Sequence, residues 1–435
     1  MKILLILASL MISVVNVYCA ELYSDDENNI NIDTKTKVTY YYQRTNLSDR
    51  SDKGADLTRT FERQEVKNYT DIQLSEYFKI SSTVGYYKNG DEYNKETDLG
   101  EIWLSQDRSN VFVEKLYGQL LLMKYDEWKL SFAYGIIPLT GGNFKKYSNQ
   151  DEIQGNGLFT LIDLNLQGEF FILSNDRDIF KVGKLFWKKD NFQHDEKLIE
   201  KNDGTDGTFV FYEHKEGKHT IELDYITANV KYDGYDMGNA QMYGVGYSYD
   251  DSLDTGFVYY GVGTYSVWNS EFLDVLNAGY FGKATNSIKY ANKKFPEQYD
   301  FDNDTQKGTS ILLGTKYYTE VFNREFDIGV EYFKTSKNYS SFNNGSLFYN
   351  DYGFWRRRGT DMYTIYADYR LMKGLKASIK YSFANNEYTA KNGSIADTTS
   401  TPPINNFYKK EQSVLFKISY EFWEIRTQGE HTCLF

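Results

Sequence analysis

Hydrophobic and polar side chains alternate with a period of two along most of this chain. Segment 374–386 shows the pattern over its whole length, and it recurs in 127–137, 218–228 and 325–335. In 374–386 the apolar positions are Leu375, Ala377, Ile379, Tyr381 and Phe383, and the polar positions are Lys376, Ser378, Lys380 and Ser382. Because successive side chains of a β-strand point to opposite faces, the alternation predicts strands with one apolar and one polar face.

Sixteen segments carry this pattern, and we predict a strand for each. They span residues 34–45, 67–75, 78–88, 111–123, 127–137, 165–174, 178–188, 208–214, 218–228, 239–249, 253–265, 309–322, 325–335, 361–371, 374–386 and 411–422. The connections between them alternate between two or three residues and ten residues or more. Short periplasmic turns and long extracellular loops are typical of transmembrane β-barrels. We therefore predict an all-β fold, a closed antiparallel transmembrane barrel of about 16 strands, with 18 as the alternative count.

Strand length separates this barrel from a soluble β-sandwich, whose strands also alternate. Sandwich strands average about 5–6 residues, whereas most of these segments have nine to fourteen residues, enough to cross a membrane at a tilt. The mean hydropathy of −0.60 is that of a soluble protein, but alternation leaves only half of a transmembrane strand apolar. The aromatic fraction of 17 %, with 40 tyrosines, suits the two membrane–water interfaces.

The beginning of the chain predicts export. Residues 1–20 have the layout of a secretory signal peptide, with Lys2 before an apolar run that is shorter than a membrane-spanning helix. An uncleaved anchor and lipidation at Cys19 are the alternatives. We assign 21–33 to a periplasmic N-terminal segment, 34–422 to the transmembrane barrel and 423–435 to a C-terminal tail.

Composition narrows the class of function. All four prolines lie in predicted long connections, as expected when every strand is hydrogen-bonded on both sides. The two cysteines are Cys19 and Cys433, so no disulfide is expected within the barrel. The net charge of −12 argues against a nucleic-acid partner. We find no metal-spaced cysteines and no phosphate-binding glycine loop, so we predict no cofactor.

The last predicted strand ends in Tyr420-Glu421-Phe422, which resembles the aromatic-x-Phe terminus by which outer-membrane barrels are recognised for assembly. The strand layout resembles the general bacterial porins, and the tyrosine-rich, proline-poor composition resembles porin-type proteins of epsilonproteobacteria. This resemblance implies the outer membrane of a Gram-negative bacterium, contact with lipid and lipopolysaccharide, and a homotrimer. It also implies passive diffusion of ions and small hydrophilic solutes through a water-filled channel.

A channel requires a filter rather than a catalytic site, because barrels of about 16–18 strands leave an aqueous lumen. In general porins the third long loop narrows that lumen. Here the third long connection is 138–164, and its opening Pro138-Leu139-Thr140-Gly141-Gly142 resembles the start of the porin constriction loop, although an ordinary turn is the alternative. Its apolar run 158–162 is expected to pack against the inner wall or to extend the next strand. The charged residues of this candidate constriction are Lys145, Lys146, Asp151, Glu152 and Asp163.

Basic residues on the predicted lumen face gather where the last strands meet the first. This basic sector consists of Lys35, Lys37, Arg370, Lys376, Lys380 and Lys417. Asp368 and Glu421 lie in the same sector and weaken its field. The wall elsewhere is acidic through Glu222, Asp224, Asp327 and Glu331. Charged walls decide which ions pass, so we predict mild ion selectivity without a sign; lysines scattered over a polar lumen are the alternative.

A second basic group, Arg356-Arg357-Arg358, lies in the seventh long loop. Arginine forks match phosphate geometry, so the group predicts an anion-collecting mouth or a contact with lipopolysaccharide phosphates. A solvated loop tip is the alternative.

Three other functions compete with the porin hypothesis. A plugged surface barrel, acting as an adhesin or structural protein, would use the long connection 266–308 as its plug. A specific transporter would need an N-terminal plug, for which 21–33 is too short and polar. An outer-membrane hydrolase would need a placed histidine, and Glu213, His214 and His219 suggest at most a metal site across one hairpin. We predict that the chain is not an enzyme.

Overall fold

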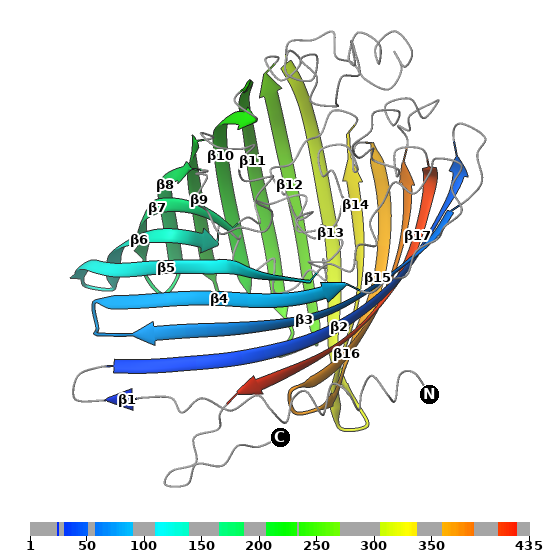
Figure 1. The fold of residues 1–435 in the computed structure, drawn as a ribbon, viewed down its shortest axis with the longest axis horizontal. Coiled ribbons are helices and arrows are strands. Elements are labelled where there is room, and N and C mark those ends of the chain that lie inside the picture. The colour runs from blue at the N-terminus through cyan, green and yellow to red at the C-terminus, as the bar shows by residue number, and fades with distance from the viewer. Residues whose placement is uncertain are drawn as a thin grey trace.

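A computed structural model describes residues 24–25, 30–50, 57–89, 109–138, 165–186, 206–232, 235–269, 305–336, 359–386 and 408–423. Their regular elements are strands, sixteen of them long (Figure 1). The strands are β1 (Ser24–Asp25), β2 (Ile30–Arg50), β3 (Leu57–Gln73), β4 (Phe78–Asn89), β5 (Ser109–Tyr125), β6 (Trp128–Pro138), β7 (Asn165–Ser174), β8 (Asp178–Phe186), β9 (Asp206–Glu216), β10 (His219–Tyr232), β11 (Tyr235–Asp251), β12 (Phe257–Asn269), β13 (Thr305–Val321), β14 (Arg324–Thr335), β15 (Thr360–Met372), β16 (Leu375–Asn386) and β17 (Tyr408–Trp423). Within these ranges no helix is long and apolar enough to cross a membrane.

The long strands form one closed sheet. Each of β2 to β16 pairs antiparallel with the strand that follows it, and β17 pairs with β2. The closing register places Tyr41 opposite Lys417 and Lys37 opposite Glu421. The short β1 adds to the start of β2, with Ser24 opposite Asn31. The predicted closed antiparallel barrel of sixteen strands is confirmed.

Two connections are shorter than predicted. β2 ends at Arg50 and β3 begins at Leu57, and β10 ends at Tyr232 and β11 begins at Tyr235. The expectation that every second connection has ten residues or more is therefore wrong at these two hairpins. The strands extend further because their extra residues pair across the ladder, for example Thr45 with Arg59. Around Arg63 both faces of β3 are polar, with Arg63 and Glu65 on one face and Glu62 and Gln64 on the other, so this extension carries no hydrophobic alternation.

The turn between β13 and β14 is a tight two-residue hairpin. Phe322 and Asn323 adopt left-handed backbone conformations with φ of 52° and 58°. Positive φ at both central residues matches the right-handed twist of the flanking strands. Asparagine tolerates this conformation, whereas a bulky phenylalanine rarely adopts it. The side chain of Phe322 is 90 % exposed at the tip of the hairpin.

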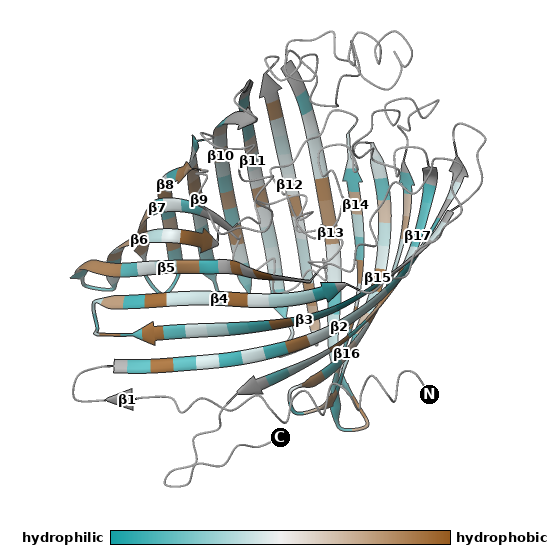
Figure 2. Ribbon diagram, viewed as in Figure 1, coloured by the Kyte–Doolittle hydropathy of each residue, from teal (hydrophilic) through white to brown (hydrophobic). Residues whose placement is uncertain are grey.

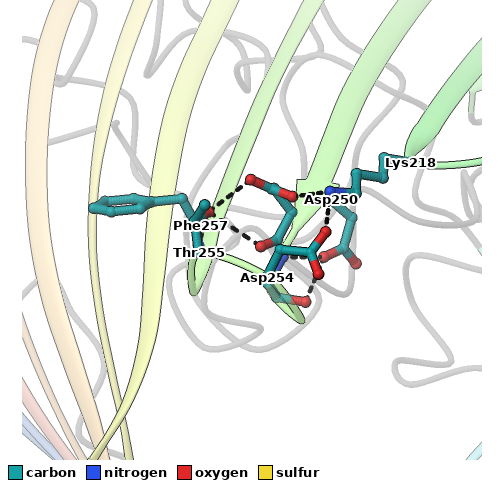
Figure 3. Close-up of polar contacts among 7 residues, drawn as sticks. Lys218, Asp250, Asp254, Thr255 and Phe257 are labelled. Atoms are coloured by element: carbon teal, nitrogen blue, oxygen red, sulfur yellow. Dashed lines mark hydrogen bonds and ion pairs between the residues drawn. The ribbon is translucent and has the colours of Figure 1, made fainter.

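A polar cluster joins two neighbouring short turns (Figure 3). Lys218, between β9 and β10, forms ion pairs with Asp251 and Asp254 at the turn between β11 and β12. Thr255 Oγ1 donates to Asp251 Oδ2 over 2.7 Å. The hydrogen bonds that Lys218 donates to Asp251 and Asp254 raise its pKa above the ordinary lysine value. The cluster thus fixes one end of the β9 to β12 wall.

The two faces of the barrel wall are inverted relative to a soluble protein. Along β10, Ile221 and Leu223 are each 43 % exposed, whereas the intervening Glu222 is fully buried. Figure 2 shows the resulting alternation of hydrophobic and hydrophilic bands along the strands. Apolar side chains on the outside and polar side chains on the inside are the pattern of a barrel that sits in lipid.

Aromatic side chains form rows on the outer face at two levels. Tyr243 lies 4.9 Å from Tyr225 and 6.3 Å from Tyr265, measured between ring centroids, in one row across β10 to β12. Near the turn end of the same wall, Phe257 lies 4.6 Å from Tyr317 and 5.9 Å from Tyr259. Two aromatic girdles flanking an apolar band are a feature of membrane barrels.

Part of the inner face is apolar and tightly packed. The first cluster extends over β6 to β11 and includes Phe170, Phe209, Ile226 and Met242, all buried. Phe170 lies flat against the wall, where a Cβ at Gly183 would come within 2.6 Å of its ring. A second cluster on β12 to β16 includes Val258, Leu312 and Phe333. The inner wall therefore divides into apolar patches and a charged surface.

Candidate functional site: the charged inner wall

Every member of the predicted basic sector lies on the inward face of the barrel. Lys35 and Lys37 belong to β2, Arg370 to β15, Lys376 and Lys380 to β16, and Lys417 to β17. These strands are contiguous through the closing β17–β2 pair. We assign their side chains to the inward face because each lies an even number of positions from a buried residue of the same strand, such as Thr39, Asp368, Ser378 or Ser419. The structure thus brings these side chains onto one continuous stretch of wall.

Four of these cations are paired with carboxylates. Lys35 Nζ lies 2.5 Å and Lys37 Nζ 3.7 Å from Glu421. On the neighbouring strands, Lys376 Nζ lies 2.7 Å from Asp368 and Arg370 lies 2.6 Å from Glu325. Asp368 and Glu421 weaken the field of the basic sector because each carboxylate lies beside lysines of the adjacent strand. Lys380 is buried at 4 % exposure, and Lys417 stands opposite Ser378.

The structure adds inward residues of β3 that the sequence pattern did not indicate. Arg63, Glu65 and Lys67 are all buried on the inward face. The Arg63 guanidinium lies 4.1 Å from the centroid of the Tyr87 ring, and Lys67 Nζ lies 3.5 Å from Glu65. Glu62 and Gln64, which lie between them on the other face, are also polar, so the sequence shows no alternation here and predicts a connection over 46–66.

The opposite part of the wall is acidic. Glu213 on β9 stands directly opposite Glu222 on β10, and both side chains are buried. Lys215 Nζ lies 3.0 Å from Glu213, and Lys181 Nζ lies 4.9 Å from the centroid of the Phe211 ring. The buried Asp224 extends the acidic surface along β10 toward Ile226 of the first apolar cluster.

A tyrosine–carboxylate network continues this acidic surface onto β12 to β15. Tyr260 donates a hydrogen bond of 2.7 Å to Glu331 and lies 3.3 Å, oxygen to oxygen, from Tyr366. Nearby, Lys316 Nζ lies 3.2 Å from Asp327. Glu222, Asp224, Asp327 and Glu331 therefore all face inward, as the alternation predicts.

Charges of opposite sign thus gather on different sectors of one cylinder. Bases outnumber acids on the inward face of β15 to β17 and β2 to β3, and acids outnumber bases on β9 to β14 among the described residues. Such an arrangement produces an electric field across the lumen. A transverse field orients and sorts charged solutes by the same Coulomb interactions that act in other pores.

Several predicted site residues lie outside the described part of the chain. These are Lys145, Lys146, Asp151, Glu152 and Asp163 of the candidate constriction, and Arg356, Arg357 and Arg358. Pro138 is described and ends β6. The signal peptide 1–20 and the tail beyond Trp423 also lie outside these ranges. The proposed plug segment 266–308 does so too, except for the end of β12 and the start of β13.

The structure does not bring Glu213, His214 and His219 of the β9–β10 hairpin together. Glu213 is buried on the inward face, whereas His214 and His219 take the outward parity of their strands. His214 Nδ1 lies 2.8 Å from Asp178, and His219 Nδ1 lies 2.7 Å from the Tyr247 hydroxyl. The hairpin register separates the three side chains onto opposite sides of the wall.

Comparison with known proteins reveals a likeness of fold. No protein-family description and no curated protein sequence matches this chain. Among solved structures, Salmonella typhi OmpF in complex with daunomycin is 12 % identical with a TM-score of 0.52, covering 92 % of this chain and all 100 % of that chain. OmpT, an outer membrane protein of Vibrio cholerae folded in vitro, is 10 % identical with a TM-score of 0.50, covering 93 % and 100 %. These likenesses establish a porin-like barrel fold.

The barrel belongs in a bacterial outer membrane. Every described strand edge is paired around the cylinder, so the wall exposes no unsatisfied backbone to lipid. The outer face is apolar between aromatic rows, and the similar OmpT barrel is an outer membrane protein. Fold, surface and similarity agree on this location.

Proposed function

We propose that this chain is an outer-membrane porin, which lets ions and small hydrophilic solutes diffuse passively through its lumen. The observation that carries the proposal is the division of charge on the inward face, with a basic surface on β15 to β3 and an acidic surface on β9 to β14. A wall that has only a structural role does not require basic and acidic side chains to lie on separate sectors around the lumen. The resemblance to general porins supports the same function.

We expect the channel to be narrow along part of the described wall. Glu222, Ser248 and Thr360 face inward and are fully buried, and Arg63 is 1 % exposed. Packing of this kind takes up part of the lumen, whereas the inward Lys35 and Lys376 keep 42 % of their side-chain surface exposed. The third long connection, 138–164, is our candidate for the segment that narrows the lumen. We therefore expect a small conductance rather than that of an open cylinder.

The same burial favours one alternative, a plugged barrel that acts as an adhesin or structural protein. A plugged barrel carries no ion current, so conductance separates the two functions. An outer-membrane hydrolase has less support, because the described histidines, His214 and His219, occupy outward positions. A specific transporter would need an N-terminal plug, for which 21–33 is too short and polar. We propose no catalytic activity.

Ion selectivity tests the role of the basic sector. In the double variant Lys380→Glu with Lys417→Glu, the inward wall gains negative charge, so the reversal potential in a salt gradient should shift toward cation selectivity. Lys334→Glu is the matched control, because Lys334 is exposed on the outward face of β14. An unchanged reversal potential in the double variant, or an equal shift in the control, would remove these lysines from the filter.

The remaining partners are also proposals. The resemblance to porins supports a homotrimer and a contact between Arg356, Arg357, Arg358 and lipopolysaccharide phosphates. The epsilonproteobacterial type stays a prediction. Neutral replacement of the three arginines should weaken lipopolysaccharide retention during purification, measured by phosphate content, without changing the reversal potential.

A further inference from the structure

The outer face of β9 to β11 carries hydrogen-bonding side chains beyond the tyrosine row that includes Tyr243. We call this group the amide ladder; its members are Asp206, Thr227, Asn229, Asn239 and Gln241. Asn229 on β10 stands between Asp206 on β9 and Asn239 on β11. On the turn side of Tyr243, the same face presents Leu223 and Val245, which are 43 % and 55 % exposed. The ladder therefore begins where the apolar band of the wall ends.

One directional chain of hydrogen bonds connects the ladder to the tyrosine row. The Tyr243 hydroxyl donates to Gln241 Oε1 over 3.1 Å, and Gln241 Nε2 donates to Asn239 Oδ1 over 3.0 Å. Asn239 Nδ2 then donates to Asn229 Oδ1 over 3.1 Å, and Asn229 Nδ2 donates to Asp206 Oδ1 over 3.4 Å. A chain in which every bond points the same way polarises its members and strengthens each bond. The amide planes are therefore held in one orientation before a ligand arrives.

The bonded amides keep hydrogen-bonding capacity for a ligand. A side-chain amide has two N–H donors and a carbonyl oxygen that accepts twice. Gln241 and Asn229 each use one donor and one acceptor position within the ladder, so each keeps one of either kind among the contacts of the described residues. Asn229 is exposed, Gln241 is partly exposed, and the adjacent Tyr243 is 43 % exposed. Paired donors and acceptors beside an exposed aromatic ring match the hydroxyl groups and apolar ring faces of sugars.

Charge and position select the source of that sugar. Asp206 is the one charged member of the ladder and is negative, so the surface repels phosphate and favours uncharged hydroxyl groups. The two aromatic rows mark the membrane–water interfaces, and the row with Phe257 is the one next to the short turns. The ladder therefore faces the layer outside the hydrocarbon on the long-loop side, which is extracellular in membrane barrels. In a bacterial outer membrane, the sugars of lipopolysaccharide occupy that layer.

We infer that the amide ladder and Tyr243 bind sugar rings of the lipopolysaccharide in the outer leaflet. The amides donate to and accept from sugar hydroxyls, and the tyrosine ring covers an apolar sugar face. This contact differs in surface and in chemistry from the one proposed for Arg356, Arg357 and Arg358, which concerns phosphates. It rests on the membrane location and holds whether or not the barrel conducts.

Binding of lipopolysaccharide with and without its sugars tests the contact. The full-length protein in detergent is titrated with lipopolysaccharide that carries core sugars and with sugar-free lipid A, and the two dissociation constants are compared. We expect tighter binding of the sugar-bearing form. In Asn239→Ala with Gln241→Ala this preference should fall by about tenfold, because hydrogen bonds to the sugar are lost. The control is Asn46→Ala with Thr58→Ala, which removes another bonded pair of β2 and β3 and should keep the preference.

The aromatic ring is tested separately from the amides. Tyr243→Phe removes the hydroxyl that begins the chain but keeps the ring, whereas Tyr243→Leu removes both, so the second variant should lose more of the sugar preference. Tyr259→Leu is the control, because Tyr259 is 50 % exposed in the aromatic row next to the short turns. Equal losses at Tyr243 and Tyr259, or no loss in Tyr243→Leu, would contradict stacking of a sugar on this ring.

The remaining outcomes are equally decisive. Equal affinity of the wild type for both lipids, an unchanged preference in the ladder variant, or an equal fall in its control would overturn the inference. Binding of the released core oligosaccharide without any preference for sugar-bearing lipopolysaccharide would assign the surface to a soluble glycan and overturn it too. A heat-dependent mobility shift verifies that every variant folds. Neutral replacement of the three arginines should weaken both lipids equally, so the two contacts fail independently.

Discussion

Tyr366 lies flat over Gly329, and this contact makes a quantitative prediction. The two residues stand directly opposite each other on β14 and β15. In Gly329→Ala the new methyl group would lie 2.7 Å from Tyr366 Cε1, and closer still to Cζ and the hydroxyl oxygen. Ordinary contact begins at 3.4 Å, so the ring must move by roughly 0.7 Å or more.

The ring has little room to move, because Tyr366 is 1 % exposed and its hydroxyl is 3.3 Å from that of Tyr260. Overpacking of this kind costs about 1–3 kcal/mol. Disturbing the bond between Tyr260 and Glu331 adds about 1 kcal/mol. We therefore expect the free energy of unfolding to fall by about 2–4 kcal/mol, the sum of these two effects.

Urea unfolding in lipid vesicles, followed by gel mobility, measures this change. Gly263→Ala is the control, because the nearest atom to its new methyl group is the Ser310 carbonyl oxygen at 4.0 Å. In a Tyr366→Leu background the same Gly329→Ala change should cost much less, since the crowding ring is gone. Equal effects at Gly329 and Gly263, or no coupling to Tyr366, would refute the packing argument.

Two further predictions concern charged groups. Arg63→Met should lower the free energy of unfolding by about 1–3 kcal/mol in the same urea assay, because the buried Glu65 loses a charged neighbour; the exposed Lys88→Met should change it by less than about 0.5 kcal/mol. In the turn between β3 and β4, hydrogen bonds from Tyr77 and then Lys124 lower the pKa of Glu76. Because the pKa of Glu76 is lower in the folded protein, its ionised carboxylate stabilises the turn at pH values above the ordinary glutamate pKa of about 4.3. This stabilisation is lost as the pH falls through the folded pKa. Hydrogen exchange at the Leu121 amide, whose N–H donates to the Tyr77 carbonyl, should therefore become faster relative to its intrinsic rate as the pH is lowered from about 6 to about 3. Glu76→Gln should abolish this pH dependence, and an identical profile in that variant would contradict the assignment.

The sequence predicts the barrel well wherever one face is apolar. In β16, Ile379 and Tyr381 are exposed while Ser378 and Lys380 are buried, as the alternation indicates. The same rule placed the basic sector on the inward face. A period of two is a local property of the backbone, so it can be read without knowing which strands are neighbours.

Features that depend on register could not be predicted. The pairing of Lys376 with Asp368 and the packing of Tyr366 on Gly329 require knowledge of which residues stand opposite each other. Alternation gives the face of a side chain but not its height on the wall. The β3 residues Arg63 and Glu65 were missed for a different reason, because Gln64 on the other face is polar too.

Ion current through the folded protein tests the porin proposal most directly. Purified full-length protein that shows a heat-dependent mobility shift is added to a planar lipid bilayer at constant voltage. We expect discrete current steps that disappear after heat denaturation. A barrel that is folded and inserted but never passes current would contradict the proposal and favour the plugged surface barrel.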